Sequence, residues 1–125
     1  MRLLFDTHVL LWWLADDTRL GESARDAIAN PENLILLSAA SIWEIRIKQA
    51  IGKLELPANF GELLAEQAFE PLAVTVSHAH AVKDLPLLHS DPFDRMLVAQ
   101  ARIERLTILT RDHMIPRYDV PTLLA

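Results

Sequence analysis

Short apolar runs alternate with helical patterns along this chain, and that alternation constrains its fold more than any other feature. Strands are expected at residues 2–6 (RLLFD), 33–38 (NLILLS), 72–76 (LAVTV) and 106–110 (LTILT), with 118–124 (YDVPTLL) as a candidate fifth. The intervening segments predict helices at residues 7–15, 21–31, 38–53, 58–69, 77–86 and 91–105. Strands separated by helices pair in parallel and are covered on both faces. We therefore predict an α/β fold with a mainly parallel central sheet of four or five strands.

The size and composition of the chain indicate one domain, residues 1–125, with its own hydrophobic core. Of its 125 residues, 51% are apolar, and none is cysteine. Asp6 interrupts the N-terminal apolar run, and the longest apolar stretch, Val9 to Ala15, is far shorter than the ~20 residues of a membrane helix. We therefore expect a cytoplasmic protein without membrane association. The formal net charge of −5 disfavours non-specific binding of nucleic acid, because Lys and Arg supply most of that affinity.

Four acidic residues lie where this fold brings them to one edge of the sheet. Asp6 ends the first strand, Asp112 follows the strand at 106–110, and Glu44 belongs to the helix after the second strand. Asp94 stands in the first turn of the helix at 91–105, whose N-terminus shares that edge if the helix runs antiparallel to the next strand. Ligands of open parallel sheets bind outside the carboxyl ends of the strands, so this edge is the candidate site.

Most of these acids also have an explanation that needs no function. Asp6 and Asp91 suit the N-caps of the helices that follow them, with Pro92 as the first helical residue. Asp94 in the first turn faces the positive end of its helix, and Asp112 suits a turn after a strand. Asp91 therefore remains either a cap alone or a cap that also contributes to an acidic site.

Glu44 has two structural interpretations. The segment Ser41 to Glu44 matches a capping box, and Glu44 stands four residues before Lys48, the spacing of a helical ion pair. If Ser38 starts the helix instead, Glu44 lies deeper in it, among apolar neighbours. An acid in that second position is harder to explain as a surface residue.

A cluster of carboxylates at one edge has a physical consequence. Like charges at close range destabilise one another unless cations or protons neutralise them. All-oxygen ligation suits Mg²⁺ or Mn²⁺, and one or two such ions activate water in many nucleases. His89 and His113 flank the acidic motifs and are further candidates for substrate contact. Trp12 and Trp13, adjacent on the first helix, suit either the core or a partner interface.

The residues quoted so far resemble a known family. The segments LLFDTHVLLW, LLSAASIWEIRIKQAIGKLEL, DPFDRMLVAQA and LTILTRDHMIPRYDV occur in this order between Leu3 and about Val120. Together they resemble PIN-domain proteins of the VapC type, the toxins of bacterial and archaeal type II toxin–antitoxin pairs. No single motif is specific, but four in order within 125 residues form a specific signature.

The resemblance implies a PIN-like three-layer α/β/α sandwich and a metal-dependent endoribonuclease that cleaves RNA phosphodiester bonds. Carried over motif by motif, it assigns the catalytic and metal-binding acids as Asp6, Glu44, Asp94 and Asp112, with Asp91 as an additional acid of less defined role. The cofactor is Mg²⁺ or Mn²⁺, as one or two ions. Weaker expectations concern contacts to substrate, which we assign to Thr7, Arg95, Thr110 and Arg111.

The resemblance also implies partners: an RNA substrate, a cognate antitoxin that neutralises the toxin, and a second copy in a homodimer. Trp12 and Trp13 are candidate residues for either protein interface. Two alternatives stay within the fold: a PIN nuclease of RNA processing outside a toxin–antitoxin pair, and a non-catalytic PIN-like binding module. A phosphoacceptor receiver domain is disfavoured, because no acid follows the third predicted strand and no lysine follows Lys83.

Overall fold

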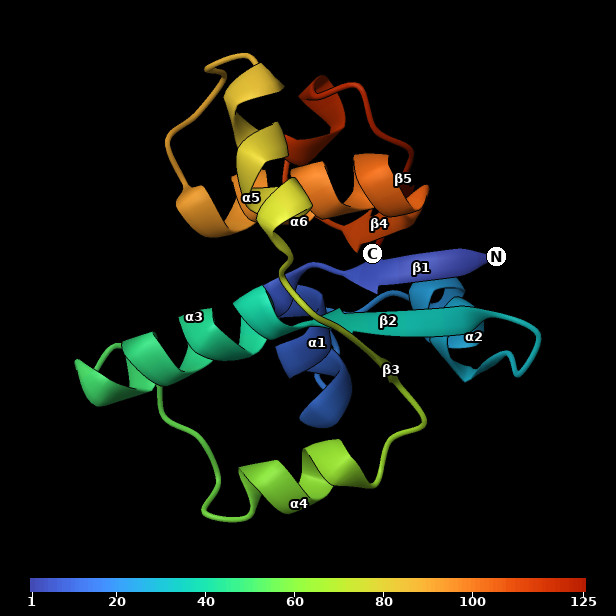
Figure 1. Ribbon diagram of the computed structural model, residues 1–125. Coiled ribbons are helices and arrows are strands. Elements are labelled where there is room, and N and C mark those ends of the chain that lie inside the picture. Colours follow the sequence, from blue (N-terminus) through green and yellow to red (C-terminus); the bar gives the residue numbers. More distant parts are fainter.

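The sheet contains five strands, all of them parallel. In this computed structural model, which describes residues 1–125, the strand order is β3-β2-β1-β4-β5 (Figure 1). The strands are β1 (Arg2–Phe5), β2 (Leu34–Ser38), β3 (Glu70–Leu72), β4 (Thr107–Thr110) and β5 (Thr122–Leu124). The predicted α/β class with a parallel sheet is confirmed, and the C-terminal segment does add a fifth strand.

Helices cover both faces of this sheet. They are α1 (Thr7–Leu14), α2 (Glu22–Ala29), α3 (Ala39–Ala50), α4 (Phe60–Ala65), α5 (Val76–Ala81) and α6 (Pro92–Glu104), with 3₁₀ turns η1 (Val82–Asp84) and η2 (Ile115–Arg117). In Figure 1, α5 and α6 lie above the sheet, α1, α2 and α4 lie below it, and α3 projects from the end of β2. The longest helix, α6, has 13 residues, and no helix is long and apolar enough to span a membrane.

The central strand β1 shows why two layers of helices are needed. Its side chains alternate between the faces, as in any strand. Leu3 and Phe5 pack into one buried cluster with α1 and α2, whereas Leu4 packs into a second cluster with α6. All three are fully buried, which is the pattern of a strand covered on both sides.

The third strand differs from its predicted position. The apolar run 72–76 predicts a strand there, but β3 ends at Leu72, and Thr75 is the N-cap of α5. Thr75 accepts a hydrogen bond from the backbone N–H of His78, whose side chain accepts one from the N–H of Thr75. This reciprocal cap, with His in place of the usual Glu or Gln, starts a helix where β-branched residues alone indicate a strand.

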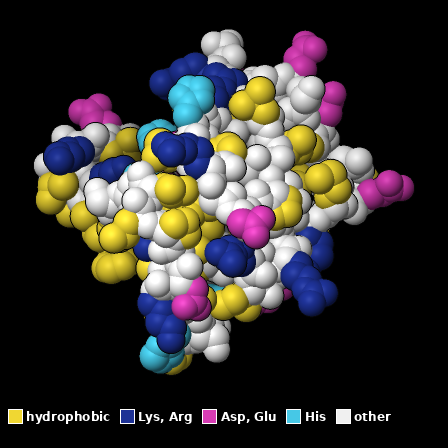
Figure 2. Space-filling model, turned by 90° about the horizontal axis from the view of Figure 1, so that it is seen from above, with side chains coloured by type: hydrophobic (Ala, Val, Ile, Leu, Met, Phe, Trp, Pro, Cys, Tyr) yellow, Lys and Arg dark blue, Asp and Glu magenta, His cyan; other side chains and the backbone are white.

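The topology places a crevice beside β1. The chain passes from β1 outward to β2 and β3, then crosses back through α5 and α6 to β4 on the other side of β1. The order of strands therefore reverses between β1 and β4, the place where open α/β sheets bind ligands. Figure 2 views the molecule from above, where acidic side chains are dispersed over the face and its edge and hydrophobic ones gather mainly on the left. The acids of the sequence motifs belong to the crevice.

Candidate active site

Asp6 closes β1 and opens α1. Its Oδ1 accepts the backbone N–H of His8 at 3.1 Å, so it is the N-cap that the sequence predicts. Its Oδ2 accepts the hydroxyl of Thr110, at the end of β4, at 2.6 Å. Burial raises the pKa of Asp6, although the hydrogen bonds from Thr110 and His8 oppose that shift. A cap alone does not require a carboxylate that is 4% exposed and bonded across to the neighbouring strand.

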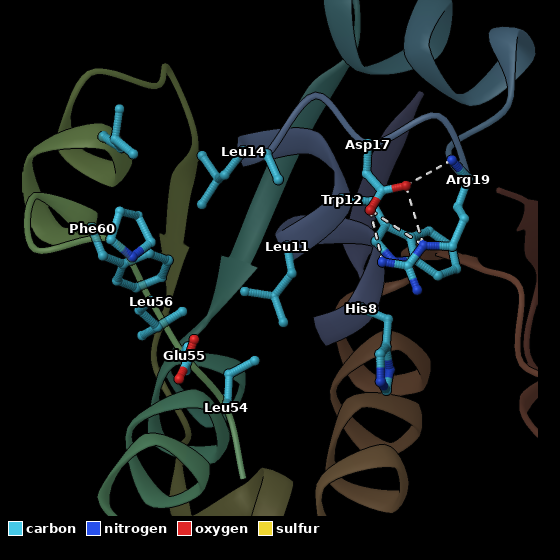
Figure 3. Close-up of a pocket in the computed structure, with 13 residues that line it drawn as sticks. His8, Leu11, Trp12, Leu14, Asp17, Arg19, Leu54, Glu55, Leu56 and Phe60 are labelled. Carbon is cyan, nitrogen blue, oxygen red and sulfur yellow. Dashed lines mark hydrogen bonds and ion pairs between the residues drawn. The ribbon is translucent and has the colours of Figure 1, made fainter. Parts of the chain in front are cut away.

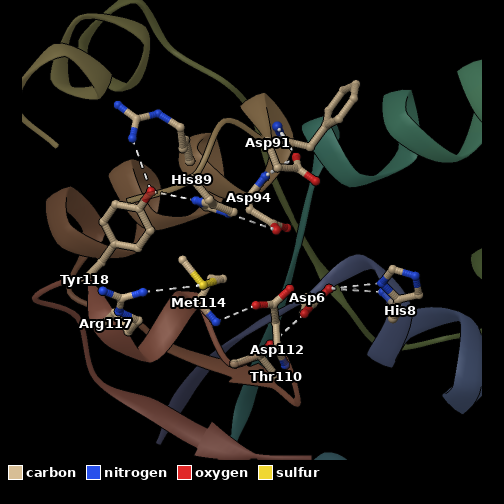
Figure 4. A network of polar contacts seen from close by, with 12 residues as sticks. Asp6, His8, His89, Asp91, Asp94, Thr110, Asp112, Met114, Arg117 and Tyr118 are labelled. Carbon is tan, nitrogen blue, oxygen red and sulfur yellow. Dashed lines mark hydrogen bonds and ion pairs between the residues drawn. The ribbon is translucent and has the colours of Figure 1, made fainter. Parts of the chain in front are cut away.

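Thr110 ties the ends of β1 and β4 together. While its hydroxyl donates to Asp6, the same oxygen accepts the backbone N–H of Asp112 at 2.9 Å. Asp112 in turn accepts the N–H of Met114 at 2.6 Å, the side-chain turn expected of an Asp after a strand. The two aspartates therefore face each other across the threonine (Figure 4). They also line a cleft of about 300 Å³ together with His8, Val9, Trp12, Arg111 and His113.

The N-terminus of α6 brings two more acids to the crevice. Asp91 is the N-cap and accepts the N–H groups of Phe93 and Asp94, at 2.9 and 3.1 Å. Pro92 is the first helical residue, and Asp94 points toward Asp6 (Figure 4). The predicted start of this helix is confirmed residue by residue.

The charge of every other acid in the cluster affects the pKa of Asp94. Burial, followed by the charges of Asp91, Asp6, Asp112 and Glu44, raises its pKa to about 8. An ordinary aspartate has a pKa near 3.8. Four carboxylates therefore lie within electrostatic range of a fifth, which is the convergence that the strand-end pattern predicts.

Glu44 reaches the same region from α3. Ser38 is the N-cap of that helix, so the alternative start at Ser41 is excluded and Glu44 lies in its second turn. The carboxylate is 3% exposed and accepts the ammonium of Lys48 at 2.6 Å, which confirms the predicted i,i+4 pair. Its second oxygen, Oε1, has no hydrogen-bond partner, and the hydroxyl of the nearby Ser41 has none either. A buried carboxylate oxygen without a donor is suited to a cation.

Comparison with known proteins assigns this arrangement to a family. The profile of the PIN domain matches residues 3–121. The chain belongs to the PIN domain family. It is 29% identical over 123 residues to Ribonuclease VapC22 of Mycobacterium tuberculosis, covering 95% of this chain and 93% of that protein. The resemblance drawn from the four sequence motifs is thereby confirmed.

Solved structures share the PIN fold at low sequence identity. VapBC2 from Rickettsia felis, bound to a DNA fragment from its promoter, aligns with a TM-score of 0.76 at 13% identity, over 100% of this chain and 99% of that one. VapBC-1 from nontypeable Haemophilus influenzae aligns with a TM-score of 0.66 at 15% identity, over 98% and 97% of the two chains. These matches confirm the predicted PIN-like α/β/α sandwich.

The donor set of this PIN domain suits a divalent cation. The structure contains no set of three or more His, Cys, Asp or Glu side chains that already converges on one metal position. The chemistry nevertheless fits: burial and the charges of the other acids raise the pKa of Asp94, and Glu44 presents an unpartnered buried oxygen. Both features are relieved by a hard cation that prefers oxygen ligands.

The predicted substrate contacts of the PIN domain divide into two groups. The hydroxyls of Thr7 and Thr110 are buried beside Asp6, that of Thr7 without a partner. Arg111 is exposed at the cleft and stacks its guanidinium 5.0 Å from the ring centre of Trp12. Arg95, in contrast, is buried, and the predicted phosphate contact is wrong for it, because its guanidinium is committed to backbone carbonyls and to Tyr118.

The adjacent tryptophans have different surroundings. Both are half-buried against the core cluster under α1. Trp13 donates its indole N–H to Gln67 at 3.1 Å, which fixes it inside the fold. Trp12 instead has the guanidinium groups of Arg19 and Arg111 over its ring and lines two clefts. Of the two, Trp12 is the one accessible to a partner or substrate.

Sequence patterns missed one component of the site. Tyr118, at the end of η2, reaches under α6 and hydrogen-bonds His89 at 2.7 Å, and His89 lies 3.3 Å from Asp94 (Figure 4). Tyr118 is 24 residues from Asp94 in a segment without regular periodicity. No spacing rule connects the two residues, so only the tertiary structure reveals the link.

Proposed function

We propose that this PIN domain is a metal-dependent endoribonuclease that cleaves RNA phosphodiester bonds. One observation carries the proposal: the carboxylates of the four PIN motifs gather at the β1/β4 crevice, where burial and then their charges raise the pKa of Asp94 to about 8. Such a concentration of negative charge destabilises the fold unless cations bind to it. The similarity to a protein named Ribonuclease VapC22 favours nuclease chemistry at that site.

The residues divide the work as follows. Asp6, Asp94, Asp112 and Glu44 would hold Mg²⁺ or Mn²⁺, as one ion or two. When bound, such an ion lowers the pKa of a coordinated water and offsets charge on the phosphate. Thr110 holds Asp6 and Asp112 in fixed orientations, and Asp91 caps the helix that presents Asp94. Arg111 supplies a cation that an RNA strand needs beside so many acids, and His8 and His113 line the same cleft as further polar contacts.

Cleavage of a labelled RNA by the purified protein tests this proposal. We expect activity with Mg²⁺ or Mn²⁺, and no activity in excess EDTA. Asp6→Asn should lower the rate about 100-fold or more, because the amide still caps α1 but binds cations poorly. The matched control is Asp26→Asn, an exposed acid on α2, which should cleave like the wild type. Activity that survives chelation or Asp6→Asn would contradict the mechanism, and an inactive but folded wild type would favour the binding-module alternative.

We also propose that the nuclease is the toxin of a type II toxin–antitoxin pair. One solved structure of similar fold is a toxin–antitoxin complex from Klebsiella pneumoniae. An apolar groove of about 390 Å³ between α1 and the segment from Leu54 to Leu63 could bind a segment of the antitoxin (Figure 3). Leu11, Trp12 and Phe60 line it. The test uses the product of a small neighbouring gene. It would support this role if it blocks cleavage and protects the fluorescence of Trp12 from quenching. Cleavage that this product leaves unaffected would favour a role in RNA processing.

A homodimer requires a second surface, and we propose the apolar one beside the N-terminus of α3. Trp43 is 65% exposed there and stacks edge-on against Phe93, and Val74 is exposed next to both. Monomeric proteins rarely expose contiguous apolar surface of this kind. Light scattering should give the mass of a dimer for the wild type and of a monomer for Trp43→Arg. A wild type that stays monomeric at high concentration would exclude the interface.

A further inference from the structure

Arg95 is a buried cation without an acidic partner. Its guanidinium donates to the backbone carbonyl of Pro86 at 2.8 Å and to those of Val82 and Leu85 at 3.3 and 3.4 Å. These bonds fix the guanidinium to the loop that precedes α6. Its remaining bond, at 3.1 Å, goes to the hydroxyl of Tyr118. Since arginine has donors only, the tyrosine oxygen must be the acceptor in this contact.

The hydroxyl proton of Tyr118 then needs an acceptor of its own. Tyr118 is 2% exposed, so water does not readily supply one. The nitrogen Nδ1 of His89 lies 2.7 Å from the hydroxyl oxygen, and the two rings lie 5.5 Å apart at their centres. A buried hydroxyl that fails to donate costs about 1–3 kcal/mol, which favours donation to Nδ1.

An imidazole that accepts at Nδ1 carries its proton on Nε2. In His89 this nitrogen lies 3.3 Å from Oδ2 of Asp94, so the N–H donates to the carboxylate. Every bond in the series therefore points the same way, from Arg95 through Tyr118 and His89 to Asp94. Figure 4 shows the part of the series from Tyr118 through His89 to Asp94. Both ring nitrogens are occupied, which argues against the predicted role of His89 as a direct contact to substrate.

We propose that Arg95, Tyr118 and His89 form a positioning chain that holds the carboxyl group of Asp94 in one orientation for cation binding. The proposal rests on the proposed function, since it concerns how that site is prepared. The contact between Nε2 of His89 and Oδ2 of Asp94 fixes the direction of that carboxyl group, as hydrogen-bond partners behind metal ligands commonly do. His89 is thus a positioning residue: it acts through Asp94.

The protonation of His89 is the first test, and it needs neither RNA nor metal. Side-chain ¹H–¹⁵N spectra of the full chain at pH 9 should show the Nε2–H tautomer. Tyr118→Phe removes the hydroxyl proton that selects this form, so its spectrum should show a mixture of tautomers. A wild-type His89 in the Nδ1–H form, or a tautomer that Tyr118→Phe leaves unchanged, would overturn the proposal.

The second test measures Mn²⁺ affinity by calorimetry on the RNA-free protein. His89→Ala should weaken binding about 10-fold, the order of effect of residues that orient metal ligands. His89→Gln should restore most of it, because an amide can accept from Tyr118 and donate to Asp94 at once. The control is His80→Ala, an exposed histidine on α5, which should bind like the wild type. Equal affinity of the wild type and His89→Ala would refute the chain.

These outcomes are separable from those of the nuclease assay. If the tautomer and the Mn²⁺ affinity depend on Tyr118 and His89 but RNA is never cleaved, the positioning chain holds and the proposed reaction fails. If RNA is cleaved but His89→Ala changes neither the Mn²⁺ affinity nor the cleavage rate, the proposed reaction holds and the positioning chain fails. Correct folding of each variant is verified by its circular dichroism spectrum.

Discussion

Two helices deliver a buried acid to the crevice, and they neutralise it in different ways. On α3, Glu44 has a full counter-charge, the ammonium of Lys48 at 2.6 Å. The hydrogen bond that Lys48 donates to Glu44 raises the pKa of Lys48, so the ammonium group keeps its charge. On α6, Asp94 has no lysine or arginine partner, only the imidazole of His89 at 3.3 Å.

The difference shows where the site demands a cation. Glu44 is balanced within its own helix, and the charge of Lys48 is shared further with Asp91 and Asp94. Asp94 is surrounded by like charges, and its pKa of about 8 means that it holds a proton at neutral pH unless a metal ion replaces that proton. On the α6 side of the crevice, the negative charge therefore still lacks a counter-ion. On the α3 side, which we call the compensated half, Lys48 already neutralises Glu44.

Asp94→Asn tests most directly whether the acid on α6 matters more to cation binding than the acid on α3. We expect RNA cleavage to fall about 100-fold or more, because the amide cannot replace the carboxylate in holding a cation. Glu44→Gln should cause a smaller loss, since Lys48 already offsets that carboxylate. Initial rates with saturating Mg²⁺ measure both effects, and equal losses would contradict the assignment of Asp94 as the more demanding acid.

The same substitution alters how stability depends on pH. The folded protein keeps the proton of Asp94 up to about pH 8, whereas the unfolded chain, with a pKa near 3.8, has already released it. The metal-free wild type should thus lose stability as the pH rises between these values, and level off above about pH 8. In Asp94→Asn this part of the decline should vanish. Urea denaturation of both proteins at pH 5 and pH 8 in EDTA measures this decline. An equal change in the free energy of unfolding between the two pH values in the wild type and in Asp94→Asn would contradict the raised pKa.

Lys48→Met tests the compensated half. It leaves the buried carboxylate of Glu44 without its donor, which should lower the free energy of unfolding by about 1–3 kcal/mol. Added Mg²⁺ should recover more stability in this variant than in the wild type, because a second acid then needs a cation. Lys53→Met removes an exposed lysine without an ion pair and serves as the control. A loss of stability that Mg²⁺ does not reduce would mean that Glu44 lies outside the cation site.

Some residues of this site can be placed from the sequence, whereas others depend on packing that the sequence does not show. Asp6, Asp91 and Asp94 are placed correctly because helix caps and strand ends are local features, determined within a few residues. Glu44 needs the choice of Ser38 over Ser41 as the cap, which packing rather than spacing decides. The link from Arg95 to Tyr118 is invisible in the sequence, since a buried arginine bonded to carbonyls has the same letter as an exposed one.

The smallest expected effect concerns Asp91, whose two roles can be separated by two substitutions. Asp91→Asn retains a good N-cap but removes a charge that helps to raise the pKa of Asp94, so that pKa should fall below about 8. Asp91→Ala removes the cap as well and should cost about 1 kcal/mol of stability. If Asp91 is only a cap, Asp91→Asn should change the Mg²⁺ concentration for half-maximal cleavage by less than about 3-fold, a free-energy difference under about 1 kcal/mol. A larger rise in that concentration would make Asp91 a ligand, the fifth carboxylate of the cation site and the second one from the N-terminus of α6.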